Sequence, residues 1–121
     1  GKRKGTYGAG FWGLPGGHLE EKESILRAGA REVKEETSLD AGLLVFSSVF
    51  NNNEREEHYV HVTLVAREST GEPVVAEPDK CEEWRWFPLD KLPYDQILWV
   101  YVPQIKAFLK DIHFVDTELA L

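Results

Sequence analysis

Apolar and polar positions along the chain predict a domain built from several strands and two helices. The segments 43–50 (LLVFSSVF) and 58–67 (HYVHVTLVAR) are rich in β-branched and aromatic residues, which is typical of strands. A polar stretch, NNNEREE, separates them and is expected to form the turn. The segment 81–89 (CEEWRWFPL) alternates as a further strand would, and Pro88 is expected to end it.

Two other segments have helical patterns. The first runs from about residue 24 to residue 37, with Ser24 as its N-cap. The second begins near Asp95 and continues through QILWVYVPQIKAFLK, where Pro103 is expected to kink or divide the helix. Strands mixed with two helices indicate an α/β or α+β sandwich.

The remaining segments read as loops within one domain that spans residues 1–121. The glycine-rich first seventeen residues contain a short apolar island at Phe11, Trp12 and Leu14, which can pair as a strand. Residues 70–80 contain two prolines and are expected to form a loop. Neither an internal repeat nor a low-complexity linker divides the chain.

Composition restricts the classes of partner. The net charge of −7 argues against binding a nucleic acid polymer, although metal ions can still carry the positive charge that a phosphorylated small molecule needs. Cys81 is the single cysteine, so an internal disulfide and a thiolate metal site are excluded. The sequence has no apolar run of roughly 20 residues and no apolar signal segment at its start. We therefore expect no membrane partner and a cytoplasmic location.

The segment REVKEETS, residues 31–38, concentrates carboxylates. On a helix that advances about 100° per residue, Glu32, Glu35 and Glu36 fall on one flank and the neighbouring basic residues fall on the other. Like charges three or four positions apart repel each other. The cluster is therefore either a solvated acidic face or a site for a divalent cation such as Mg²⁺ or Mn²⁺, which prefer hard oxygen ligands.

The preceding stretch, WGLPGGHLEEKES, favours the cation site. Its Gly-Gly turn lets the backbone pass close to a ligand, and Glu23 comes just before the helix. The N-terminus of a helix also suits phosphate oxygens. Phosphate donors, backbone groups and carboxylates are therefore expected to converge on one side of the helix.

With these residues the sequence resembles the Nudix hydrolase family. The family motif is Gly, five residues, Glu, seven residues, Arg-Glu, an aliphatic residue, any residue, Glu-Glu, any residue, Gly and an aliphatic residue. Its spacing is met by Gly17, Glu23, Arg31, Glu32, Val33, Glu35, Glu36 and Leu39. Ser38 departs from the motif because it stands where the family has Gly, at the helix end. A left-handed conformation there would cost Ser about 1 kcal/mol.

The resemblance extends from Gly1 to about Trp99 and implies a Nudix-type α/β/α sandwich with a mixed sheet. GKRKG, LPGGHLE, EPDKCEEWRW and LPYDQILW are similar to the branch with the human diphosphatase of thiopurine nucleotides and a plant hydrolase of oxidised purine nucleotides or geranyl diphosphate. Family members have one or two apolar strands before the position of GKRKG. We therefore expect those strands to be missing from this chain or replaced by another segment. Residues 113–121 (HFVDTELAL) are the candidate replacement, and in a dimer one subunit could donate them to the other.

The family's metal chemistry implies Mg²⁺, or Mn²⁺, as cofactor. Glu32 and Glu36 would be the main ligands, with Glu35 beside them and the Gly16 carbonyl completing the shell. Glu32 is also the first candidate to activate or orient the attacking water, because an ordinary carboxylate is a weak base and the metal must do much of the activation.

Supporting roles follow from the same resemblance. Glu23 would support the metal-bound waters, and Arg31 would hold the carboxylates in position. A plain surface ion pair is the alternative for Arg31. A fourth acidic ligand from a later loop is common in the family, with Glu82 and Glu83 as candidates.

The substrate-binding side carries weaker signals. Arg3 and His18 match positions that contact phosphates in the purine-nucleotide branch, and His18 is equally well a turn residue without a role. The full set of substrate-binding candidates is Arg3, Leu14, Gly17, His18, Trp99 and Tyr101. Trp12, Tyr59 and Leu98 are further side chains that either frame a base or pack in the core. Val100 stands where the human relative has Gly, which puts purine selectivity by analogy in question.

The implied function is Mg²⁺-dependent hydrolysis of a nucleoside triphosphate, of purine type, to a monophosphate and pyrophosphate. Alternative substrates are a nucleoside diphosphate linked to another group, or a prenyl diphosphate. A catalytically silent Nudix-like binding module is the alternative of a different class, although silent members usually lose a motif glutamate and this chain retains all of them. Relatives form homodimers, so we expect a homodimer here.

Overall fold

The computed structural model describes residues 1–5, 7–53 and 57–116. Three consecutive strands separate the first helix from the second in the described residues, and a 3₁₀ turn precedes the second helix. The elements are β1 (Lys2–Arg3), α1 (Ile25–Thr37), β2 (Leu44–Asn52), β3 (Tyr59–Ala66), β4 (Cys81–Glu83), the 3₁₀ turn Tyr94–Gln96, α2 (Tyr101–Leu109) and β5 (Phe114–Val115).

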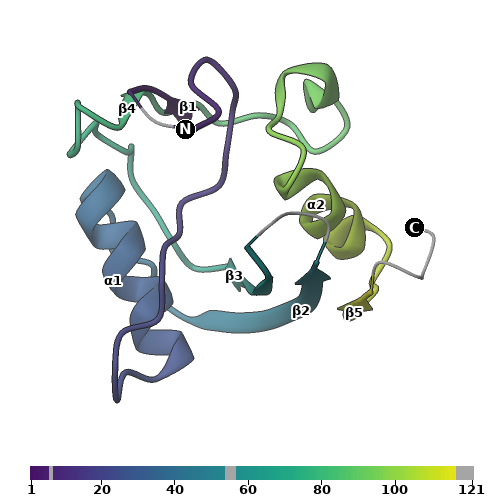
Figure 1. Ribbon diagram of the computed structural model, residues 1–121. Coiled ribbons are helices and arrows are strands. Elements are labelled where there is room, and N and C mark those ends of the chain that lie inside the picture. The colour runs from purple at the N-terminus through teal and green to yellow at the C-terminus, as the bar shows by residue number, and fades with distance from the viewer. Residues whose placement is uncertain (6, 54–56, 117–121) are drawn as a thin grey trace.

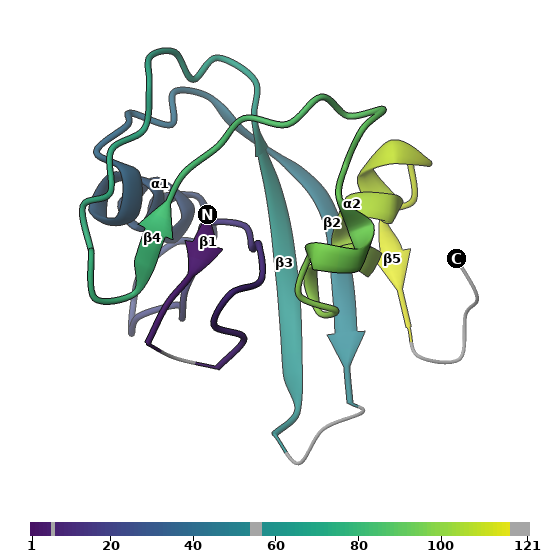
Figure 2. The same cartoon turned by 90° about the horizontal axis from the view of Figure 1, so that it is seen from above.

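Two sheets are present, and the larger one is mixed as expected. β2 lies between β3, to which it is antiparallel, and β5, to which it is parallel. β1 and β4 form a separate antiparallel pair. Figure 1 shows this pair at the top, the larger sheet across the bottom, and α1 and α2 toward opposite ends of that sheet. Figure 2 shows α2 next to β2 and β5, with α1 on the far side of β3.

The two helices cover opposite faces of β3, which confirms the α/β/α layering. Neighbouring residues of a strand point to opposite faces. A Cβ on Gly29 of α1 would come within 2.8 Å of a Leu64 methyl group, so a glycine at this position lets the helix approach the sheet closely. On the other face, the Thr63 hydroxyl donates to the Gln104 side chain of α2 at 2.9 Å. A buried core of Phe50, Ala107 and Val115 lies under α2.

Helix α1 begins and ends where local sequence signals predict. The Ser24 hydroxyl accepts a hydrogen bond from the Arg27 amide at 3.2 Å, as an N-cap does. Ser38 is the C-cap, in the left-handed region at φ 63° and ψ 5°, and its amide donates to the Lys34 carbonyl at 3.0 Å. The sequence prediction of left-handed backbone at Ser38 is confirmed.

The second helix is shorter than the pattern predicted. The 3₁₀ turn Tyr94–Gln96 is separated from α2, which starts only at Tyr101. Pro103 neither kinks nor divides α2, because it is the third residue of the helix, where an amide has no intrahelical acceptor. The prediction of a kink at Pro103 was wrong.

Two further strand predictions are corrected. Asn51 and Asn52 belong to β2 rather than to the turn, while residues 54–56 lie outside the described part of the chain. Only Cys81–Glu83 of the 81–89 segment is a strand. Trp84 then turns inward and its Nε1 donates to the Glu36 carbonyl at 3.2 Å.

The apolar island around Trp12 and the C-terminal segment form only short β-pairings. Trp12 forms single bridges with Lys2 and with Ile97. β5 pairs with β2 of the same chain, and residues 117–121 of the candidate replacement strand lie outside the described residues. No helix in the described part of the chain has the length and apolar character needed to cross a membrane.

Candidate active site

A cavity of about 380 Å³ brings α1, the glycine-rich loop and the β1–β4 pair together. Glu32, Glu35 and Glu36 of α1 line one side of it. Gly13, Leu14, Gly16 and Gly17 contribute from the loop, and the β1–β4 side contributes Lys2, Arg3, Glu77, Lys80, Cys81 and Trp84. Residues from three separate parts of the chain thus meet at one cavity.

The glycine-rich loop lies directly against the carboxylates of α1. The Gly16 amide donates to Glu36 Oε2 at 2.9 Å. A Cβ on Gly17 would lie 2.2 Å from Glu32 Oε1, so the backbone passes where no side chain fits. The role of the Gly16 carbonyl as a metal ligand stays a prediction, because the contact that the structure gives is through the amide.

Arg31 forms hydrogen bonds with several of the carboxylates around it. This is consistent with the prediction from the resemblance that Arg31 holds these carboxylates in position. Its guanidinium binds Glu23 in a bidentate manner, with Nε donating to Oε2 at 2.7 Å and Nη2 donating to Oε1 at 3.0 Å. Nη1 donates to Glu32 Oε1 at 2.9 Å and to Glu35 Oε2 at 3.3 Å. The side chains of Arg31 and Glu23 are only 23% and 13% exposed, so this is more than a plain surface pair.

These contacts shift the pKa values of the ion pair in opposite directions. The hydrogen bonds from Arg31 hold the pKa of Glu23 below its ordinary value. The hydrogen bonds that Arg31 donates, first to Glu23 and then to Glu32, raise the pKa of Arg31, although burial opposes this shift. Both groups therefore stay charged, and Glu32 is fixed in orientation by a permanent cation.

Glu36 has a different environment from Glu32. Burial raises the pKa of Glu36 from 4.5 to about 7, with the negative charges of Glu32 and Glu77 acting in the same direction and the Gly16 amide opposing them. A cation close to Glu36 would favour the ionised form. The chemistry of the site therefore suits a positively charged ligand at this carboxylate.

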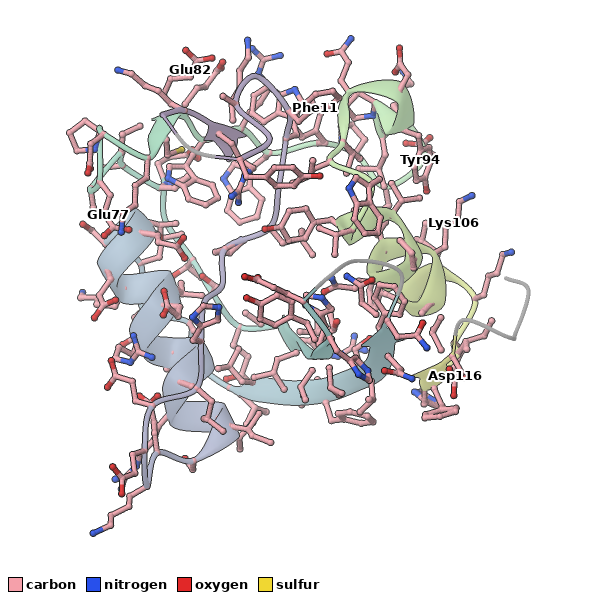
Figure 3. All side chains as sticks on the ribbon, in the orientation of Figure 1. Phe11, Glu77, Glu82, Tyr94, Lys106 and Asp116 are labelled. Carbon is pink, nitrogen blue, oxygen red and sulfur yellow. The ribbon has the colours of Figure 1, made fainter. Side chains whose placement is uncertain are left out.

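Glu77 is an acid of the cavity that the sequence patterns missed. Backbone hydrogen bonds connect the loop before it to the end of α1: the Val74 amide donates to the Thr37 carbonyl at 3.0 Å and the Ala76 amide to the Glu36 carbonyl at 3.4 Å. Figure 3 shows Glu77 beside this end of the helix. Its charge is close enough to raise the pKa of Glu36.

Glu82 and Glu83, the candidates for a later acidic ligand, lie away from the cavity. Glu82 pairs with Lys2 at 3.3 Å and points outward at the top of Figure 3. Glu83 pairs with Arg85 at 2.8 Å. Neither residue lines the cavity, whereas Glu77 does.

The substrate-binding candidates divide into two groups. Arg3, Leu14 and Gly17 line the cavity. His18 and Trp99 do not: His18 stacks on Tyr59 with ring centroids 5.8 Å apart, and Trp99 Nε1 donates to the Tyr7 hydroxyl at 3.0 Å. Of the further aromatic and apolar candidates, Trp12 and Leu98 are buried core residues.

Tyr101 lies behind the loop and reaches Arg3. Its ring packs on Gly13, and Arg3 Nη1 donates to its hydroxyl oxygen at 3.2 Å. Burial raises the pKa of Tyr101, Arg3 opposes this shift, and the charge of Glu36 adds to it. The phenol therefore stays neutral beside both charged groups.

The donor set fits a hard divalent cation. Carboxylates from Glu32, Glu35, Glu36 and Glu77 line one cavity, and a loop backbone lies against two of them. Oxygen donors of this kind suit Mg²⁺ and Mn²⁺. Within the residues that the structure describes, no three acidic, histidine or cysteine side chains already converge on one point. Cation binding therefore requires rotation of the carboxylates, three of which are engaged in ion pairs: Glu32 and Glu35 with Arg31, and Glu77 with Lys80.

Known proteins are similar to this chain over most of its length. The NUDIX domain family matches residues 1–108. The oxidized purine nucleoside triphosphate hydrolase of Danio rerio is 35% identical over 121 aligned residues, which cover 90% of this chain and 73% of that protein. The ADP-ribose pyrophosphatase of Methanocaldococcus jannaschii is 31% identical over 94 residues, which cover 76% of this chain and only 54% of that protein.

Solved structures give the same family. The MutT NUDIX hydrolase from Burkholderia pseudomallei superposes with a TM-score of 0.78 and 34% identity, covering 88% of this chain and 83% of that chain. A MutT structure from a study of Aliivibrio salmonicida and Vibrio cholerae has a TM-score of 0.66 at 19% identity, covering 89% of this chain and 82% of that chain, and supports the fold alone. The chain therefore belongs to the Nudix family of hydrolases.

Proposed function

We propose that this chain hydrolyses a purine nucleoside triphosphate, in ordinary or oxidised form, to the monophosphate and pyrophosphate with Mg²⁺. The observation that carries the proposal is that one cavity has the carboxylates of α1 on one side and the basic residues Lys2, Arg3 and Lys80 on the other. A triphosphate needs both sides, because cations bound by the acids and basic side chains together neutralise its charge. The purine assignment is supported by the similarity to the Danio rerio hydrolase of oxidized purine nucleoside triphosphates.

The metal would be held by Glu32 and Glu36, with Glu35, Glu77 and the Gly16 carbonyl as further oxygen donors. When bound there, Mg²⁺ would neutralise phosphate charge and lower the pKa of a water ligand. Glu32 would orient the attacking water, since Arg31 fixes its carboxylate at 2.9 Å.

The remaining residues of the site would bind and orient. Glu23 holds Arg31 on the side away from Glu32, so the position of Glu32 depends on the Glu23–Arg31 pair. The amide of Gly16 orients Glu36. Arg3 would bind phosphate oxygens on the basic side of the cavity.

A second candidate substrate is a nucleoside diphosphate linked to another group. The similarity to the ADP-ribose pyrophosphatase favours it, although this chain spans only 54% of that protein. Prenyl diphosphates remain a third candidate from the resemblance described above. A silent binding module is disfavoured by the retention of Glu32, Glu35 and Glu36 around one cavity.

The test is a phosphate-release screen over nucleoside triphosphates, including oxidised purines, nucleoside diphosphate conjugates and prenyl diphosphates, each with Mg²⁺. Glu36→Gln runs beside the wild type, and Glu82→Gln is the control because Glu82 is an acid outside the cavity. We expect the wild type and Glu82→Gln to release pyrophosphate from purine triphosphates and Glu36→Gln to lose at least 100-fold in rate, as the removal of one electrostatic group at a catalytic site typically does (about 10²–10³). Equal inactivity of wild type and Glu36→Gln on every substrate would favour the binding module instead.

The homodimer expected from the resemblance is part of the proposal. Sedimentation at micromolar concentration tests it, and a single monomeric species would contradict it.

A further inference from the structure

The basic side of the cavity contains one cation that differs from its neighbours. Lys2 pairs with Glu82 at 3.3 Å, and Lys80 pairs with Glu77 at 3.7 Å. Among the described residues, no carboxylate lies within ion-pair distance of Arg3, although Arg3 lines the same cavity. Its positive charge is therefore available to an anion, whereas the charges of the two lysines are already balanced in part.

Neutral acceptors hold Arg3 in place. Its Nε donates to the Tyr7 carbonyl at 2.8 Å, and its Nη1 donates to the Tyr101 hydroxyl oxygen at 3.2 Å. A guanidinium has five donors in one rigid plane, so bonds from Nε and Nη1 fix that plane and leave the donors of Nη2 without a protein acceptor among the hydrogen bonds of Arg3 in the described residues. Neutral partners orient the group without cancelling its charge, which a carboxylate in the same place would do.

Tyr101 is itself fixed by packing. It is the first residue of α2, and a Cβ on Gly13 would lie 2.7 Å from its Cε2 and 3.2 Å from its Cζ. The ring thus fills the space behind the loop, and Gly13 lines the cavity on the other side. The hydroxyl is placed by a ring that cannot move toward the loop.

We propose that Tyr101 is a positioning residue, whose hydroxyl holds the Arg3 guanidinium toward the phosphates of the substrate. This inference rests on the proposed function for the assignment of Arg3 to phosphate. It gives Tyr101 a role at the phosphate end of the substrate rather than as a frame for the base. Substitution of its hydroxyl is then expected to weaken phosphate binding only while Arg3 is present.

The experiment is a double-mutant cycle between Tyr101→Phe and Arg3→Ala. Tyr101→Phe removes the hydroxyl and leaves the ring on Gly13. Tyr94→Phe is the matched control, because Tyr94 lies on the 3₁₀ turn beside Lys106 (Figure 3), with Nζ of Lys106 5.7 Å from its ring centroid, and does not line the cavity. Calorimetry measures the Kd of inorganic pyrophosphate with Mg²⁺, and steady-state kinetics measure KM and kcat for a purine nucleoside triphosphate.

We expect Tyr101→Phe to raise both Kd and KM about fivefold, with kcat within about twofold of wild type and an unchanged melting temperature. The net contribution of one ordinary intramolecular hydrogen bond supports an effect of this size. In the Arg3→Ala background the same substitution is expected to change nothing, and Tyr94→Phe is expected to change neither Kd nor KM in either background. A variant that keeps the charge, Arg3→Lys, is expected to show the same rise in KM, because an ammonium cannot reach both neutral acceptors.

The inference is overturned if Tyr101→Phe has the same effect with and without Arg3, since Tyr101 would then contact the substrate itself. It is also overturned if Arg3→Ala weakens pyrophosphate binding while Tyr101→Phe does not, or if the wild type does not bind pyrophosphate. Nucleotide hydrolysis is measured separately. If the wild type binds pyrophosphate and the effects of Arg3 and Tyr101 on binding are coupled, but no nucleotide is hydrolysed, the proposed function is contradicted. The positioning role of Tyr101 would then still hold.

Discussion

Replacing Ser38 with glycine should stabilise the protein. Ser38 ends α1 in the left-handed region at φ 63°, where a side chain crowds the backbone and glycine does not. The residue is exposed, and among the described residues its hydroxyl makes no hydrogen bond. The bonds at this helix end use its backbone: the amide donates to the Lys34 carbonyl, and Lys34 Nζ donates to the Ser38 carbonyl at 3.2 Å. Glycine would therefore retain every contact.

The expected gain is the difference between two opposing effects. Relief of the left-handed strain contributes about 1–2 kcal/mol. The greater freedom of glycine in the unfolded chain subtracts about 0.4–1 kcal/mol. The net gain for Ser38→Gly is about 0.5–1 kcal/mol, which corresponds to a rise in melting temperature of about 2–4 °C for a domain of this size.

Urea denaturation followed by circular dichroism measures the gain as a higher midpoint with an unchanged slope. Ser38→Ala is the matched control, because it removes the hydroxyl and retains the Cβ that is strained at φ 63°. We expect Ser38→Ala to be no more stable than the wild type. Equal stabilities of the glycine and alanine variants would refute the reasoning, since the strain would then contribute nothing.

Three further predictions concern the cavity. Gly17→Ala should lower kcat about 100-fold with little loss of stability, because its Cβ would occupy the place of Glu32 Oε1 and displace a flexible carboxylate by about an ångström; kinetics and a melting curve on the same sample check this. Glu77→Gln should raise the Mg²⁺ concentration for half-maximal rate about tenfold, whereas Glu82→Gln should leave it unchanged. If the dependence of rate on Mg²⁺ were the same for both variants, Glu77 would be excluded from the site. In EDTA, Glu36→Gln should melt above the wild type by a margin that grows from pH 5 to pH 8. Burial raises the pKa of Glu36 to about 7, above the value of 4.5 for the free side chain, so its contribution to stability is present below pH 4.5 and is lost as the pH rises through 7. A margin that stays constant with pH would contradict that assignment.

Local signals were sufficient for α1 and its carboxylates. The N-cap at Ser24, the motif spacing and the left-handed end at Ser38 depend on residues within a few positions of one another. The holding role of Arg31 followed from the family resemblance. Its partner Glu23 is eight residues away, but the turn before the helix brings the two together.

The patterns in the sequence did not predict contacts between segments that are distant along the chain. Residues 84–87 alternate like a strand, yet their side chains pack rather than pair: Phe87 meets Trp12 edge to face at 4.9 Å, and the Arg85 guanidinium lies 5.1 Å from the Trp12 ring centroid. The alternating pattern in this segment therefore reflects packing against Trp12, which is distant in the sequence, rather than pairing in a sheet. Pro103 was misjudged because its effect depends on where the helix begins, which the apolar pattern alone does not fix.

Glu77 was missed for a related reason, and that reason connects the stability of α1 with its chemistry. The last carbonyls of a helix have no partner within the helix. Here the carbonyls of Glu36 and Thr37 accept hydrogen bonds from the loop that precedes Glu77 and from Trp84. The end of α1 thus positions a cavity acid through its backbone, and no sequence motif records such contacts.

The same geometry explains why Ser38 is tolerated where the family has glycine. Because Ser38 adopts the left-handed conformation that glycine would adopt, the helix ends at the same residue and the carbonyls of Glu36 and Thr37 remain available to the loop. The substitution then costs strain energy without moving Glu77 or Glu36. The departure from the motif should lower stability and leave the catalytic rate unchanged, so Ser38→Gly is expected to raise the denaturation midpoint with kcat and KM within about twofold of wild type. A change in rate as large as that of a cavity variant would mean that the helix end, and with it the loop before Glu77, differs between the two proteins.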